Sequence, residues 1–166
     1  SLSKELKENP NLPIEKVLSN QDLMISIRNE SPDLISYFAK NNNIHLQELF
    51  DIALTTKLNN QNIDFRFNRN ASNVLSTASQ KFQKIVIDSL ILFKSLNYFM
   101  SNSKLYRDPT FSGHFQRILQ TYMYFTNGTL LEQLPGMSDF LINNIDILSY
   151  KQLLVFLIED FQEKLN

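Results

Sequence analysis

The segment from Asp108 to Gly128 constrains the fold more than any other part of the chain, because it has the pattern of a long amphipathic helix. Asp108 can accept hydrogen bonds from the free N–H groups of a first helical turn, and Pro109 has no N–H to leave unsatisfied there. Asn127-Gly128 predicts the end of the helix, since glycine readily adopts the left-handed conformation. Apolar side chains recur between these signals at steps of three and four residues, at Phe111, Phe115, Ile118, Leu119, Tyr122 and Phe125. The segment therefore predicts a helix with one buried face, and it contains no catalytic side chains.

Similar helical patterns, separated by capping and turn residues, cover most of the chain. Pro13 and Pro32 have the position of first-turn prolines, and Asn43 is expected to cap the helix that follows it. The cluster of asparagines from Asn59 to Asn62 predicts a mobile loop. The predicted helices are 33–40, 44–54, 71–75, 89–102, 109–126, 137–144 and 149–165, and single turns are expected at 82–86 and 129–134. Period-2 alternation is not convincing anywhere, and 3 Gly with 5 Pro are too few for the turns of a sandwich or barrel. The sequence therefore predicts an all-α fold.

The short linkers between these segments favour antiparallel helical hairpins. Segments 93–102 and 135–144 are faintly alike at a lag of about 42 residues, which fits the helix-pair repeat of HEAT and armadillo solenoids. An irregular superhelical array of this kind and a compact helical bundle both remain open. We expect residues 1–166 to form a single α-helical domain.

The composition disfavours several classes of partner. A formal net charge of −1 creates no global field that would attract nucleic acid or anionic lipid. The absence of Cys excludes a disulfide framework and a thiolate zinc site, and it is compatible with a reducing compartment. No apolar run approaches the ~20 residues that cross a bilayer. We therefore expect an intracellular, cytoplasmic protein with neither a nucleic-acid nor a membrane partner.

Catalytic and metal-binding patterns are weak. His45 and Glu48 share one helix face and could form half of a metal site, but no second pair of this kind occurs. His114 stands alone, and we interpret both histidines as surface or half-buried side chains. No zinc-protease, nucleophile-elbow, Walker or Rossmann motif is present. We therefore expect a protein that is not an enzyme and binds neither metal nor cofactor.

Arginine and aromatic side chains are the best candidates for contacts with a protein partner. Aromatic side chains offer a large contact area with few rotatable bonds, and arginine offers a planar group with several hydrogen-bond donors. Such residues cluster in the run Phe65-Arg66-Phe67-Asn68-Arg69, and they recur in the second half of the chain. Tyr122 falls on the predicted buried stripe, whereas Tyr124 lies off it and is expected to be exposed. The alternative is that these are solvated arginines and core phenylalanines. The predicted partner-binding residues are Arg66, Phe67, Arg69, Arg107, Arg117 and Tyr124.

A further feature is a set of seven successive segments: 11–18, 29–38, 45–49, 66–76, 108–119, 139–145 and 150–158. Together these segments resemble the SAPS-domain family, the regulatory subunits of Ser/Thr phosphatases of the phosphatase 6 type. The resemblance begins at Asn11-Leu12-Pro13-Ile14, which is similar to the family's opening Leu-Pro element, and it extends to about residue 160. The departures include Asn70 in place of a family proline, and Ser72-Asn73 in place of Cys-Glu.

This resemblance implies a HEAT/armadillo-like array, here the N-terminal part of a longer SAPS-like domain. It also implies a scaffold that binds a phosphatase catalytic subunit and directs its choice of substrates, while the metals belong to the phosphatase. Two other hypotheses remain open. One is a helical adaptor that recognises another peptide or helix. The other is an enzyme or small-molecule binder whose pocket would hold His45, Glu48 or His114.

Overall fold

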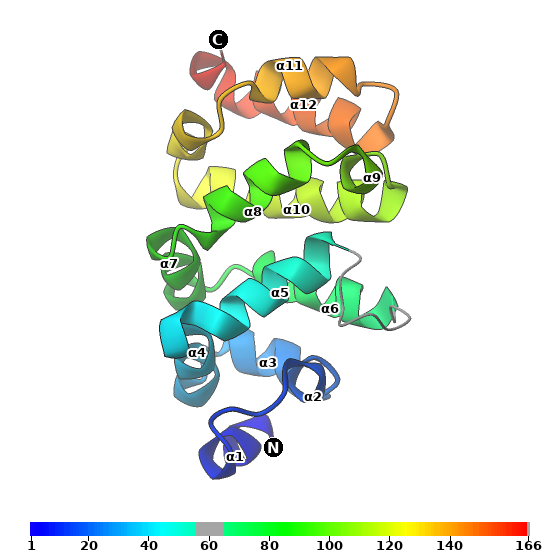
Figure 1. The fold of residues 1–166 in the computed structure, drawn as a ribbon. Helices are drawn as coiled ribbons and strands as arrows, with labels where there is room; N and C mark the ends of the chain where they lie inside the picture. Colours follow the sequence, from blue (N-terminus) through cyan, green and yellow to red (C-terminus); the bar gives the residue numbers. More distant parts are fainter. Residues whose placement is uncertain (56–64, 166) are drawn as a thin grey trace. The chain divides into compact units, whose positions relative to one another are not determined.

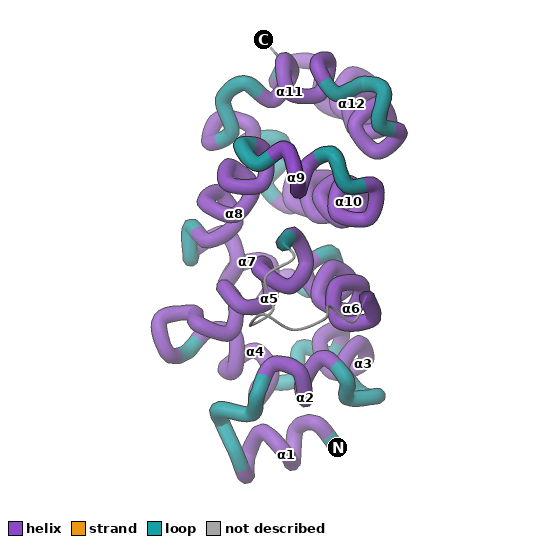
Figure 2. The backbone as a smooth tube through the Cα atoms, turned by 45° about the vertical axis from the view of Figure 1, so that its right-hand side comes forward, coloured by secondary structure: helices purple, strands orange, loops and turns teal. Residues whose placement is uncertain are grey.

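A computed structural model describes residues 1–55 and 65–165, and their architecture is entirely helical. Figure 2 shows helices joined by loops and turns, with no strand in these residues. The prediction of an all-α fold is thus confirmed. The predicted mobile loop at Asn59 to Asn62 lies outside the described residues.

The helices are short apart from α5, α6, α10 and α12 (Figure 1). The α-helices are α1 (Leu2–Glu8), α2 (Ile14–Leu18), α3 (Leu23–Arg28), α4 (Pro32–Ala39), α5 (Ile44–Leu54), α6 (Phe65–Leu75), α7 (Gln80–Asp88), α8 (Ile91–Met100), α9 (Ser103–Tyr106), α10 (Pro109–Phe125), α11 (Met137–Asn143) and α12 (Leu148–Phe161). The 3-10 helices are η1 (Asn41–Asn43), η2 (Thr129–Gln133) and η3 (Gln162–Lys164).

The longest helix, α10, has the ends that its sequence predicts. The Asp108 carboxylate accepts hydrogen bonds from the N–H groups of Thr110 at 2.9 Å and Phe111 at 3.0 Å. After the last turn, Gly128 adopts a φ of +86° and its N–H donates to the Met123 carbonyl. A Cβ atom at Gly128 would lie 3.0 Å from the Phe161 ring, so this turn also allows the C-terminal segment to pack closely.

Asn43 does not cap α5 as predicted. It adopts a φ of +59°, and its side-chain amide donates at 3.2 Å to the carbonyl of Phe38 near the end of α4. Its side chain therefore donates to a carbonyl group near the end of α4 and does not accept a hydrogen bond from an N–H group of α5. A second difference lies between α8 and α10, where the predicted linker contains the short helix α9.

The chain divides into two compact units, Ser1–Leu92 and Phe93–Asn166, and each is described by itself. In the first unit α5 packs on α6 and α4 packs on α7, with the Phe38 and Phe82 rings in edge contact at 5.4 Å. In the second unit α10 and α11 pack on α12, and Phe115 stacks on Phe99 at 4.8 Å. A single domain over residues 1–166 stays a prediction.

Candidate functional site

Helix α10 presents two of the predicted partner-binding residues, Arg117 and Tyr124. They lie seven residues, about two turns, apart and so share one helix face, opposite the buried stripe. The Tyr124 side chain is 62% exposed, whereas Tyr122 is fully buried, as the sequence predicts. Arg117 is also exposed, and its guanidinium forms no ion pair with a described residue.

Contacts with three residues of α12 hold the Tyr124 ring in place. Its hydroxyl donates to the Asp160 carboxylate at 2.7 Å, and its ring lies edge-on to Phe156 with centroids 5.3 Å apart. A second ring contact, with Phe161, has a centroid distance of 5.8 Å. The hydrogen bond to Asp160 is the main cause of a raised pKa of Tyr124. The ring is therefore an exposed aromatic side chain that is already ordered, which lowers the entropy cost of binding a partner.

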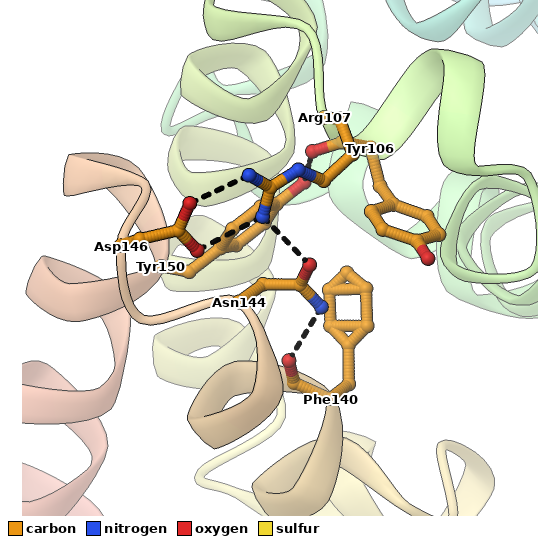
Figure 3. A network of polar contacts seen from close by, with 6 residues as sticks. All are labelled: Tyr106, Arg107, Phe140, Asn144, Asp146 and Tyr150. Carbon is orange, nitrogen blue, oxygen red and sulfur yellow. Dashed lines mark hydrogen bonds and ion pairs between the residues drawn. The ribbon is translucent and has the colours of Figure 1, made fainter.

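Arg107, another predicted partner-binding residue, is engaged within the second unit (Figure 3). Its guanidinium forms a two-point ion pair with Asp146, with N–O distances of 2.9 and 2.5 Å, and donates to the Asn144 side chain at 3.2 Å. The hydrogen bonds of this pair lower the pKa of Asp146 and raise that of Arg107. A partner that recruits Arg107 would therefore compete with an existing ion pair.

The remaining candidates, Arg66, Phe67 and Arg69, lie on α6 in the first unit. Arg66 and Arg69 are exposed, and Phe67 is half-buried. The residue between them, Asn68, is fully buried and its amide donates to the Ile52 carbonyl at the end of α5, at 2.5 Å. Asn70 donates at 2.8 Å to the carbonyl of Leu18, the last residue of α2. These two asparagines fix the rotation of α6 and thereby direct its arginines outward.

The candidates of the first unit thus lie together on α6, whereas those of the second unit form two groups, Arg107 and the α10 pair. Sequence reasoning missed the residues that position them, namely Asn68, Asn144, Asp146 and Asp160. In the sequence, asparagines indicate loops. That Asn68 and Asn144 position other residues is seen only from the hydrogen-bond partners of their side-chain amides. The two carboxylates lie on distant segments, and no sequence signal pairs them with Arg107 or Tyr124.

The histidines are more buried than predicted. His45 is 9% and His114 is 8% exposed, because both lie on the inner side of their helices. His45 Nδ1 lies 2.6 Å from a Glu48 carboxylate oxygen, and its ring stacks on Tyr37 at 4.0 Å. Burial is the main cause of a raised pKa of Tyr37, whose hydroxyl donates to the Leu12 carbonyl. The His45–Glu48 pair belongs to the first unit and His114 to the second, so these residues do not form one cluster within a unit.

A hollow of about 380 Å³ in the first unit is lined by Lys7, Tyr37 and Lys40, among others, but not by His45 or Glu48. Among the described residues, no group of three or more His, Cys, Asp or Glu side chains could hold a metal ion. Nor does any helix in this part of the chain have the length and apolar character that a bilayer crossing needs. Neither family models, curated proteins nor solved structures give a match to the chain.

Proposed function

We propose that this chain is a non-catalytic regulatory subunit that binds a Ser/Thr phosphatase catalytic subunit of the phosphatase 6 type and directs its choice of substrates. We also propose that its helices continue as a HEAT/armadillo-like array. The proposal of a phosphatase rests on the resemblance of seven successive segments to the SAPS-domain family. The observation that supports a protein-binding surface is Tyr124, an exposed aromatic ring that Asp160 and Phe156 hold in one orientation.

Tyr124 and Arg117 have the chemistry of interface anchors. Arg and Tyr are enriched among residues that contribute most to protein–protein affinity, because each combines a large contact area with directional hydrogen bonding. An anchor ordered before binding loses less side-chain entropy when the complex forms. Arg117 adds a cation on the same helix face, two turns away, which suits a partner surface with an exposed carboxylate.

The experiment is a titration of the whole chain with purified phosphatase 6-type catalytic subunit, followed by calorimetry. We expect Tyr124→Ala to weaken binding by about 30-fold, which corresponds to a loss of roughly 2 kcal/mol of binding free energy. Arg117→Ala should weaken binding by about tenfold. Tyr98→Ala and Arg28→Ala are matched controls, since both side chains are exposed and lie outside the proposed surface. Binding that is absent in the unsubstituted chain, or equally weakened by the controls, contradicts the proposal.

The alternative function is a helical adaptor that recognises another peptide or helix. It is favoured by aliphatic side chains exposed at the end of α11 and just after it, where Ile142 is 55% and Ile145 is 46% exposed. Aliphatic surface of this kind suits the apolar face of an amphipathic helix. Substitution of both isoleucines by serine distinguishes the two functions: it would abolish adaptor binding and leave phosphatase binding through α10 unchanged.

A further inference from the structure

Helix α12 carries an exposed stripe that the proposed phosphatase surface does not use. Leu148 is 65%, Val155 is 44% and Ile158 is 47% exposed, although all three are aliphatic. Their spacing of seven and three residues places them along one helix face. The opposite face of α12, which includes Tyr150, Leu153 and Leu157, is buried in the second unit. The stripe is thus additional to the face that holds the helix in its unit.

Two charged residues flank Val155 of this stripe symmetrically. Lys151 lies four residues before Val155 and Glu159 lies four residues after it. Each is therefore about 6 Å along the helix axis from Val155, on opposite sides. Both side chains are exposed, and neither forms an ion pair with a described residue. Such an arrangement is self-complementary only for a helix that runs in the opposite direction.

We propose that this stripe binds a second copy of the chain, with two α12 helices packed antiparallel about a two-fold axis at Val155. In this arrangement Lys151 of each copy faces Glu159 of the other, and Val155 packs on its own symmetry mate. A two-fold interface requires this relation, in which residue i meets residue j and residue j meets residue i. A parallel arrangement in register would instead place like charges opposite each other.

The expected dimer is weak. Fourteen residues of helix span about 21 Å, and one helix face of this length provides less than the roughly 800 Å² per partner of a standard interface. Exposed ion pairs add little to affinity, so they act mainly by selecting the antiparallel orientation over the parallel one. The dimer should therefore form at high protein concentration and dissociate on dilution.

The test is sedimentation equilibrium of the whole chain between about 10 µM and 1 mM, the range that reveals weak association. We expect a reversible monomer–dimer equilibrium. Lys151→Glu places two carboxylates opposite each other at both symmetry-related contacts, and Glu159→Lys does the same with two ammonium groups. Each substitution alone should weaken the dimer by about tenfold or more. Lys94→Glu is the matched control, because Lys94 is exposed on α8 and lies outside the stripe.

Two rescue experiments separate the proposed pairing from a general charge effect. The double variant Lys151→Glu/Glu159→Lys restores both contacts with reversed polarity and should dimerise like the unsubstituted chain. An equimolar mixture of the two single variants should form a heterodimer, because each chain then supplies only one sign of charge. A chain that stays monomeric at 1 mM, a dimer insensitive to Lys151→Glu, or a double variant that remains monomeric would each overturn the proposal. Phosphatase binding through α10 is measured separately and does not depend on this outcome.

Discussion

Removing the hydroxyl group of Tyr122 should make the protein more stable. Tyr122 is fully buried in α10, and its hydroxyl oxygen has no hydrogen-bond partner among the described residues. Burial also raises the pKa of this phenol well above its ordinary value. A hydroxyl group that loses its hydrogen bonds to water on burial, and gains no partner in the protein, costs about 1–3 kcal/mol of folding free energy. Tyr122→Phe removes that cost and leaves a void of about 20 Å³, which costs about 0.5 kcal/mol.

The net expectation is a gain of about 1 kcal/mol in the free energy of unfolding. Tyr150→Phe is the matched control, because Tyr150 is also fully buried in the second unit but its hydroxyl donates to the Tyr106 carbonyl (Figure 3). Loss of that hydrogen bond should cost about 1 kcal/mol, so the two variants should differ by about 2 kcal/mol.

Urea denaturation of the whole chain, followed by circular dichroism, measures both changes. Both tyrosines belong to the same unit, so the comparison holds whether or not the two units unfold together. If Tyr122→Phe destabilises the protein as much as Tyr150→Phe does, the Tyr122 hydroxyl is not an unsatisfied group and the reasoning is refuted.

Three further predictions concern helix ends and glycines. Gly113→Ala should raise the free energy of unfolding by about 0.5–1 kcal/mol, because a Cβ there would meet only the Ser149 hydroxyl at 3.8 Å. Gly128→Ala should lower the free energy of unfolding by more than about 1 kcal/mol, because Gly128 has a positive φ and lies against the Phe161 ring. Equal effects of the two substitutions in urea denaturation would contradict this prediction. Asp108→Ala should cost about 1 kcal/mol through loss of the α10 cap, and Asp108→Asn should recover most of it in the same assay. Glu30 accepts hydrogen bonds from the Lys81 N–H and the Ser79 hydroxyl, which lower its pKa; its contribution to stability is therefore present at neutral pH and lost as the pH falls through this lowered pKa. A melting-temperature profile of Glu30→Gln should show a smaller decline in acid than that of the unsubstituted chain, and parallel profiles would contradict this prediction.

Local signals in the sequence predict much of the helical structure. The limits of α10 follow from the Asp108 cap and from Gly128, and the opposite exposure of Tyr122 and Tyr124 follows from helical periodicity alone. These features depend on residues within a few positions of each other, which is why sequence patterns suffice for them.

Features that depend on distant segments could not be predicted in this way. Asn68 bonds to a carbonyl sixteen residues earlier, and Arg107 pairs with Asp146 thirty-nine residues later. From the sequence, both residues are expected to be polar surface side chains. Neither periodicity nor spacing indicates that a backbone carbonyl will lie beside Asn68 or a carboxylate beside Arg107. The prediction that Asn43 caps α5 was wrong for a different, local reason: the left-handed backbone conformation of Asn43 turns its side chain back toward α4.

The aromatic core of the second unit has a consequence for how the protein emerges from the ribosome. Phe115 on α10 contacts Phe140 and Tyr150, both of which are translated after α10 is complete. The first unit, by contrast, draws its internal contacts from residues up to Leu92 and can bury its core while translation continues. The part of the α10 apolar face that Phe140 and Tyr150 cover in the folded unit therefore stays exposed until α11 and α12 have been synthesised.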